Sequence, residues 1–354
     1  MDLAAAERDE NVRLIRESAA GLAPRTGDLR RVRGLRFASP GFDRAVWRQM
    51  CEMGWPGLLV AEADGGAGLG MRALCALAEE LGAALAPEPL ISAVLAARLL
   101  RGDGLAAQLD GTRLVLPAWQ ERANRLEIGA GTRVVNGRVS GRKMFIPAAG
   151  GADDFLVATV DGAVLVARDA AGVTLTLEQT QDGGEFGTLV LDNTACVPVP
   201  GDFAAGLDEA ALATAAYLLG VMDRAFAITL EFLKVRKQFG KPIGSFQALQ
   251  HRAADLKIAV ALARATVEAA AGILDDGATG AARQAAVSRA KARASDAAMA
   301  ICRQAIQLHG GIGYTDEADP GLFLRKAMVL ANLYGSAALH RARYALVALD
   351  EDEA

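Results

Sequence analysis

The length, composition and charge of this chain are those of a globular protein with more than one domain. It has 354 residues, of which 52% are hydrophobic and 23% charged, so it can bury a substantial core and is not a disordered chain. Lys and Arg total 38 against 42 for Asp and Glu, a net charge of −4, which offers no basic surface for nucleic acid. The four cysteines lie far apart and show no metal-ligand spacing, so we expect neither a metal site nor a disulfide framework.

The sequence also lacks the signals of export and membrane insertion. The first residues, MDLAAAERDENVRLIRE, carry charges where a signal peptide would be apolar. No uninterrupted apolar run reaches the ~20 residues that a membrane-spanning helix needs, and the most apolar piece of the first third, 90–100, contains Arg98. We therefore expect a cytoplasmic protein with no membrane partner.

The first 110 residues have the periodicity of helices. Apolar residues repeat at spacings of three and four in two places: Phe42, Val46, Met50 and Met53, and then Leu74, Leu77, Leu81 and Leu85. Between them lies the glycine-rich stretch 63–70, whose backbone could approach a phosphate. No strand–loop–helix pattern surrounds it, so a sharp turn before a helix is the simpler interpretation.

The pattern changes to that of strands between about residue 111 and residue 200. The stretch 134–139 predicts a hairpin with an Asn136-Gly137 turn, and 173–177 alternates apolar residues with threonine. Further short strands are expected at 155–157, 164–166 and 189–191. Short strands with no helical pattern between them predict a small antiparallel sheet or barrel.

The remainder of the chain is again helical. One apolar stripe runs over several turns through Leu249, Ala253, Leu256, Val260, Ala263 and Val267, and the abundant alanine lets helices pack closely. The boundary falls near the glycines at 201–206. We predict an α+β protein with an N-terminal helical domain (1–110), a middle β-domain (111–205) and a C-terminal helical bundle of four-helix type (206–354).

Two segments of the last region resemble signatures of the acyl-CoA dehydrogenase family. The first is 236–251, RKQFGKPIGSFQALQH, and the second is 307–317, QLHGGIGYTDE. Both occur in the order and at about the separation found in that family, and the helix–β–helix plan matches over nearly the whole chain. The resemblance implies a three-domain flavoprotein that binds FAD and oxidises an acyl-CoA thioester between its α- and β-carbons.

The resemblance also implies which residues meet FAD. In the family the first segment contacts the FAD pyrophosphate across a subunit interface, where Arg236 would provide a fixed positive fork for phosphate oxygens. By itself, Arg236 could equally be part of a solvated helix end. His309 is interpreted as a hydrogen-bonded structural residue rather than an acid or base. The implied contact residues of this region are Arg236, Gln238, Phe239, Phe246, Gln247, Gln307, Leu308, Gly310, Gly311 and Ser336.

Two further positions in the β-domain correspond to flavin contacts. The stretch 141–147 resembles the family strand whose aromatic residue covers the flavin ring, and Phe145 takes that place. Pro147 stands where a threonine normally hydrogen-bonds the flavin, and proline has neither a hydroxyl nor a backbone N–H. In the preceding loop, 117–122, only Glu121 matches the usual residues, so the flavin would be held somewhat differently here.

The catalytic base of the family is missing from its usual place. Matching Gly335 and Arg341 to the family's glycine and arginine puts Tyr334 where the base glutamate normally stands. Tyrosine, with a reference pKa of ~10, is a poor base near neutral pH. Some relatives carry the base on the first long helix of the C-terminal domain, where Glu209 lies one residue from the matching position. Glu209 is therefore a candidate base, although it and Asp208 also suit the N-terminus of a helix.

These observations leave three hypotheses about function open. The stretches 81–90, 310–325 and 340–343 look most like bacterial small-subunit members, which pair with a larger, base-carrying subunit and often act on steroid side chains or other bulky acyl-CoA esters. The chain would then be a base-lacking subunit of a mixed oligomer. It could instead be a self-sufficient dehydrogenase with Glu209 as base, or a flavin monooxygenase of the same fold. The implied partners are an acyl-CoA substrate, an acceptor of the electron-transfer flavoprotein type and further subunits in a dimer or tetramer.

Overall fold

The computed structural model describes residues 3–352, and the side chains of residues 7–347. The chain forms two compact units, each built from separate stretches of sequence. One unit holds the residues up to 30, residues 75–86 and the chain from 211 onward. The other holds residues 31–74 and 87–210. This division differs from the three consecutive domains expected from the sequence, whose boundaries stay a prediction.

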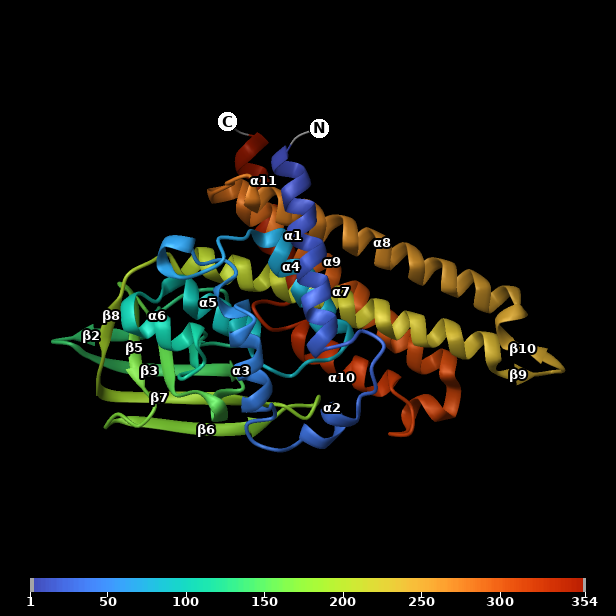
Figure 1. Ribbon diagram of the computed structural model, residues 1–354, viewed down its shortest axis with the longest axis horizontal. Helices are drawn as coiled ribbons and strands as arrows, with labels where there is room; N and C mark the ends of the chain where they lie inside the picture. Colours follow the sequence, from blue (N-terminus) through green and yellow to red (C-terminus); the bar gives the residue numbers. More distant parts are fainter. Residues whose placement is uncertain (1–2, 353–354) are drawn as a thin grey trace. The chain divides into compact units, whose positions relative to one another are not determined.

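Helices occupy the first part of the chain, as predicted, and end before the first strand (Figure 1). They are α1 (Leu3–Leu22), α2 (Arg30–Leu35), α3 (Arg44–Glu52), α4 (Met71–Ala83), α5 (Leu90–Leu99) and α6 (Gly102–Leu109). In α3 the buried side chains are Trp47, Met50 and Cys51, whereas Met53, expected on the apolar stripe, is exposed just past the helix end. The glycine-rich stretch forms a short 3₁₀ turn, Glu62–Asp64, and a loop before α4.

Eight strands form two four-stranded sheets within the second unit. They are β1 (Val115–Ala118), β2 (Arg133–Val135), β3 (Arg138–Pro147), β4 (Asp154–Thr159), β5 (Gly162–Ala167), β6 (Val173–Gln179), β7 (Glu185–Ala195) and β8 (Val197–Val199). One sheet has the order β2-β3-β7-β6 and is antiparallel throughout. The other has the order β1-β4-β5-β8, and its β1–β4 pair is parallel, so the expected antiparallel arrangement holds for every pair but this one.

The predicted β2–β3 hairpin is confirmed, with its register set by the turn. Val135 pairs with Arg138, and the two turn residues Asn136 and Gly137 have φ values of 50° and 72°. Asparagine and glycine adopt this left-handed conformation at low cost, which suits a two-residue hairpin turn. Helix α5 of the same unit, buried along nearly its whole length, packs against β1.

The C-terminal part consists of long antiparallel helices. Helix α7 (Phe203–Val235) and helix α8 (Gln247–Asp275) are joined by a hairpin of β9 (Lys237–Gln238) and β10 (Lys241–Pro242), as Figure 1 shows. They are followed by α9 (Gly280–His309), α10 (Pro320–Leu330) and α11 (Ala337–Asp352). Both α8 and α11 pack along α9, and Leu256, Val260, Ala263 and Val267 of the predicted α8 stripe are buried.

Glycine lets α4 and α7 cross at close range in the first unit. A Cβ at Gly220 would lie 1.9 Å from the carbonyl oxygen of Glu79, and one at Gly82 would lie 2.0 Å from that of Tyr217. Real Cβ atoms do not approach so closely, so both positions require glycine. The Tyr217 hydroxyl, buried at this crossing, donates to the carbonyl of Ala86 at 2.9 Å.

A buried ionic network joins α1, α4 and α8 in the same unit, and Arg25 extends it to Asp223 of α7 at 2.8 Å. Its centre is Glu79, whose carboxylate accepts hydrogen bonds from Arg16, Arg25 and Arg264 at 2.7–3.1 Å. Burial raises the pKa of Glu79, but the hydrogen bonds and charges of Arg264 and Arg16 outweigh it and lower that pKa to about 2. The carboxylate is therefore ionised at neutral pH and serves as a structural anchor.

One helix among the described residues, α7, is long and apolar enough to cross a membrane by length and composition alone. Of its most apolar 18-residue window, 78% is buried inside the protein. A core helix has the same character, and α7 is packed as one.

Candidate functional site

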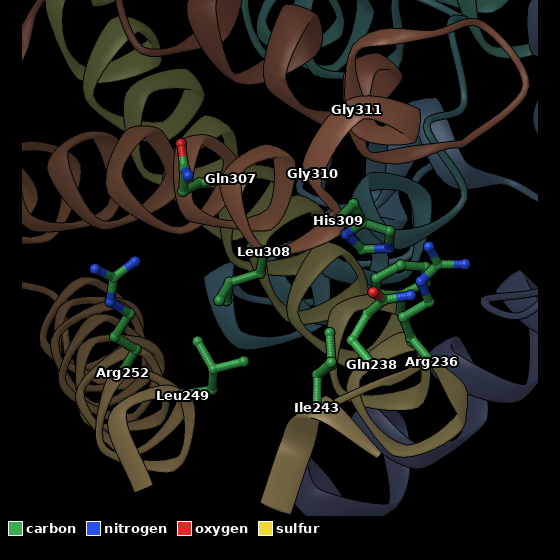
Figure 2. A pocket seen from close by; sticks show the side chains of 11 residues that line it. Arg236, Gln238, Ile243, Leu249, Arg252, Gln307, Leu308, His309, Gly310 and Gly311 are labelled. Atoms are coloured by element: carbon green, nitrogen blue, oxygen red, sulfur yellow. The ribbon is translucent and has the colours of Figure 1, made fainter. Parts of the chain in front are cut away.

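The ends of three helices and the hairpin between two of them line a pocket of about 430 Å³ within the first unit. Its walls come from the end of α7, the hairpin that follows, the start of α8 and the C-terminal end of α9. Figure 2 shows Arg236 and Gln238 on the side of His309, and Arg252 and Leu249 on α8 at the opposite side. The lining residues are Phe232, Arg236, Gln238, Ile243, Leu249, Arg252, Gln307, Leu308, His309, Gly310 and Gly311.

The cavity combines positive charge with open backbone. Two guanidinium groups, Arg236 and Arg252, line it from opposite sides, and the amides of Gln238 and Gln307 add neutral donors and acceptors. The helix α9 ends at His309, and Gly310 follows with φ 67°, a conformation that favours glycine. A Cβ at Gly310 would meet nothing within 4 Å, so the backbone here is open to a ligand. This donor set suits an anionic group such as a phosphate.

His309 forms part of the cavity wall as a hydrogen-bonded structural residue. Its Nδ1–H donates to the carbonyl of Ala305 at 2.7 Å, and its ring stacks on Phe232 with centroids 4.3 Å apart. Burial lowers the pKa of His309, with the bond to Ala305 opposing that shift. The imidazole is therefore neutral near pH 7 and contributes a flat surface and one ring nitrogen.

The structure brings six of the predicted FAD-contacting residues together around this cavity. They are Arg236, Gln238, Gln307, Leu308, Gly310 and Gly311. Sequence reasoning missed Arg252, Phe232, Ile243 and Leu249. Arg252 had a usable signal, because it lies three residues after Leu249 and so faces the same side of α8.

The other predicted contact residues of the C-terminal part lie elsewhere. Phe239 is 89% exposed at the tip of the β9–β10 hairpin, with φ 51°, and its ring meets that of Phe246 edge-on at 6.2 Å. Gln247 begins α8, and Ser336 precedes α11. The Ser336 Oγ accepts a hydrogen bond from the Leu339 N–H at 3.4 Å, which makes Ser336 the N-cap of that helix. For these four residues FAD contact stays a prediction.

Phe145 and Pro147 lie on β3 in the second unit, at an irregular part of the strand. The pairing of β3 with β7 shifts register between Lys143 and Ile146, and Phe145 has φ 58°. Such strain in a non-glycine residue is retained where the surroundings fix it. Its ring packs edge-on against Phe186 with centroids 6.0 Å apart.

A buried ion pair ties this part of β3 to the preceding loop. The Lys143 ammonium donates to the carboxylate of Glu121 at 2.6 Å, and that carboxylate also accepts from the Gly131 N–H and the Thr132 hydroxyl. Burial lowers the pKa of Lys143, with Glu121 opposing the shift. Glu121, the one residue of this loop that matched the family, is therefore held as a structural anchor.

The two candidate bases have different environments. Tyr334 is buried, with φ 55°, in the segment between α10 and α11. Glu209 is buried in the second turn of α7 and accepts two hydrogen bonds from Arg98, at 3.1 and 3.4 Å. The interpretation of Glu209 as a helix cap is wrong, because α7 begins earlier, at Phe203, and Asp202 caps it by accepting the Ala205 N–H at 3.0 Å.

Comparison with known proteins assigns this architecture to a class of enzyme. The family description "Acyl-CoA dehydrogenase, C-terminal domain" matches residues 202–348, and "Acyl-CoA dehydrogenase, N-terminal domain" matches residues 9–109. The chain belongs to the acyl-CoA dehydrogenase family. It is an FAD-dependent oxidoreductase of that family, as the two sequence signatures indicated.

Particular relatives cover nearly the whole chain. The acyl-CoA dehydrogenase IpdE2 of Mycolicibacterium smegmatis is 33% identical over 333 residues, covering 92% of this chain and 95% of its own. The solved structure of a Tcur3481-Tcur3483 steroid ACAD variant is 30% identical, with a TM-score of 0.88 and 99% of both chains covered. The ChsE4-ChsE5 complex from Mycobacterium tuberculosis is 26% identical, with a TM-score of 0.83 and 96% of both chains covered.

The residues around the cavity fit an FAD molecule. Arg236 and Arg252 would hold the negatively charged pyrophosphate, and the open backbone at Gly310 and Gly311 would let the dinucleotide approach closely. The stacked rings of Phe232 and His309 offer an apolar wall. When bound, FAD supplies the acceptor for the hydride that leaves the β-carbon of the acyl-CoA.

Proposed function

We propose that this chain is a cofactor-sharing, base-lacking subunit of a mixed oligomeric acyl-CoA dehydrogenase. The observation that carries the proposal is that the family's base position is occupied by Tyr334, whose side chain is buried between α10 and α11 in the chain. Removal of the α-proton needs a positioned base, and such a base typically contributes ~10²–10⁴-fold to the rate. A phenol with a reference pKa of ~10 does not supply that at neutral pH.

The environment of Glu209 also supports this proposal. Its carboxylate has two hydrogen bonds to the Arg98 guanidinium, and its side chain is only 9% exposed. Both carboxylate oxygens are engaged by the guanidinium, and these bonds would have to break before Glu209 could reach a substrate proton. The pair has the geometry of a structural bidentate bridge, and we assign Glu209 that role rather than the role of base.

The relatives agree with a mixed oligomer. Two of the solved structures bear the names of two different components, Tcur3481-Tcur3483 and ChsE4-ChsE5, and the former is described as a steroid ACAD. We propose by analogy that this chain pairs with a larger, base-carrying subunit and that the substrate is a bulky acyl-CoA ester of the steroid side-chain type. FAD would lie across the interface between subunits, with Arg236 at the pyrophosphate.

The proposal also covers the electron acceptor, the oligomeric state and the cellular compartment. We propose that electrons pass from FAD to an acceptor of the electron-transfer flavoprotein type, that the assembly is a dimer or tetramer, and that it works in the cytoplasm. The four cysteines are all free, which agrees with a reducing compartment.

The test is anaerobic bleaching of the bound flavin. The purified chain, loaded with FAD, is mixed with octanoyl-CoA and, separately, with a CoA thioester of a steroid side chain. We expect no bleaching by the chain alone, and bleaching by the steroid thioester once a base-carrying subunit is co-expressed with it. Rapid bleaching of the isolated chain, unaffected by Glu209→Gln, would show that another base is present and overturn the proposal.

A further inference from the structure

The segment that carries Tyr334, residues 331–336, is held by a lysine that no sequence motif marks. Lys291, in the middle of α9, is 0% exposed. Its Nζ donates to the carbonyl oxygens of Leu330, Ala331 and Gly335, each at 3.1 Å. It also lies 3.1 Å from the Ser295 hydroxyl, one turn further along α9.

The three carbonyls match the three hydrogens of an ammonium group. Burial lowers the pKa of Lys291 to about 7, so the measurements described below are made at pH 6, where the ammonium form predominates. Leu330 and Ala331 end α10, where the last carbonyls have no partner inside the helix and carry the negative end of its dipole. Gly335 lies at the other end of the segment, one residue before the Ser336 cap of α11. Lys291 therefore joins the end of one helix to the start of the next. Buried carbonyls without such a donor would destabilise this arrangement.

A second buried side chain holds the same segment. The ring of His340, in α11, donates from Nε2 to the carbonyl of Tyr334 at 2.9 Å, and its Nδ1 lies 3.3 Å from the Ser288 hydroxyl. Burial, and then the charge of Lys291, lower the pKa of His340 to about 3. A neutral ring has one N–H, and the carbonyl partner identifies Nε2 as the nitrogen that carries it.

We propose that Lys291 is a positioning residue that fixes residues 331–336, and with them Tyr334 and Ser336, in one conformation. The segment needs such support because Tyr334 has φ 55° and is buried, a conformation that a non-glycine residue adopts only when its surroundings impose it. We call Lys291 and its three carbonyl acceptors the clamp. Its functional meaning rests on the proposed function, because that proposal is what assigns Tyr334 and Ser336 to the site. The clamp itself is testable without substrate or cofactor.

The experiment follows the tyrosines by ¹⁹F NMR in protein labelled with 3-fluorotyrosine. The chain has four tyrosines, and Tyr217, buried in the same unit and bonded to Ala86, is an internal reference far from the segment in sequence. Each line is assigned by a Tyr→Phe variant. Lys291→Met keeps the apolar stem and removes the ammonium, and Lys257→Met makes the same chemical change at an exposed position on α8.

In Lys291→Met we expect the Tyr334 line to move toward that of the exposed Tyr314 while the Tyr217 line stays in place. Amide hydrogen exchange in residues 331–336 should become roughly ten- to hundred-fold faster, the effect of losing hydrogen bonds to a charged group. Residues 212–222 should exchange as in the wild type. Lys257→Met should change neither measurement.

Two results would overturn the proposal. One is an unchanged Tyr334 line together with unchanged exchange in residues 331–336. The other is a parallel shift of the Tyr217 and Tyr334 lines, which would mean that Lys291 stabilises the fold as a whole and positions nothing in particular. If Lys291→Met does not fold, Lys291→Gln, which keeps two N–H donors, replaces it, with the same pattern expected at smaller amplitude. Failure of the bleaching test with a positive result here would reject the proposed function and retain the clamp.

Discussion

The assignment of Glu209 as an ion-pair residue makes a quantitative prediction about Glu209→Gln and Arg98→Met. The Glu209 side chain is 9% exposed and that of Arg98 is 41% exposed, so the pair has one buried and one solvated member. Each substitution removes the attraction between the two charges, which are joined by hydrogen bonds of 3.1 and 3.4 Å, but leaves a different group behind. The two losses of stability should therefore be unequal.

The expected losses of stability follow from the group that each substitution leaves behind. Glu209→Gln leaves an uncharged acceptor beside a guanidinium that can turn to water, so we expect a loss of about 1 kcal/mol, near the lower limit for bonds to charged groups once solvent screening is included. Arg98→Met leaves the buried carboxylate without its charged partner, and breaking an ion pair at its buried member costs about 3 kcal/mol or more. In the double variant, Glu209→Gln should recover most of the stability lost in Arg98→Met, because it removes the buried charge that the single variant leaves behind.

Urea unfolding of the three variants and the wild type measures their free energies of unfolding, and flavin bleaching is recorded on the same samples. We expect FAD content to be unchanged and bleaching to be absent in all four when the chain is alone. If the wild type bleaches and Glu209→Gln abolishes this with FAD retained, Glu209 is the base and the reasoning above is wrong. Equal losses from both single variants would contradict the assignment of the buried charge.

Three further outcomes are expected. Arg236→Ala should weaken FAD binding roughly ten-fold in a fluorescence titration, because it removes a charge-assisted phosphate contact. The control is Lys234→Ala, which removes the same charge two residues earlier and outside the cavity wall and should leave the FAD affinity within about two-fold. Equal effects of the two variants would reject a specific contact between Arg236 and FAD. The pKa of Glu79 is lowered from 4.5 to about 2, so its contribution is complete above pH 4.5 and is lost as the pH falls toward 2. Glu79→Gln should therefore lower the free energy of unfolding by about 3 kcal/mol at pH 7 and flatten its dependence between pH 4.5 and 2, as measured by urea titration across that range. Tyr334→Glu should produce flavin bleaching in the chain alone, and a folded, FAD-loaded variant that does not bleach would show that a carboxylate at this position is not sufficient.

Local pattern was enough to predict the kinds of element and several residues that line one pocket. The Asn136-Gly137 turn fixed a hairpin because both residues tolerate positive φ, and Gly310 follows the end of α9 for the same reason. The two sequence signatures supplied Arg236 and Gln307, which the fold brings to one cavity. These features depend on residues close together in the chain, where steric preference and spacing act directly.

Contacts between distant parts of the chain could not be predicted from local sequence pattern. The parallel β1–β4 pair escaped prediction because strand direction depends on the path of the chain and not on the two-residue period of either strand. Asp202, rather than Asp208 or Glu209, caps α7 because the helix starts earlier than its periodicity showed. Arg98 and Glu209 are 111 residues apart, and nothing in either segment indicates the other.

The sequence by itself determined the family, the cofactor and the absence of a carboxylate at the usual base position, because these follow from residue identity within short motifs. Only the tertiary structure decided what the charged residues do. In α9, Lys291 stands between Arg289 and Arg293 and is separated from each by one alanine, yet Arg289 is exposed and Lys291 is fully buried. Its burial is determined by the end of α10 and the segment before α11, whose carbonyls accept hydrogen bonds from its Nζ. In an isolated helix the lysine would stay in water, where its charge is solvated.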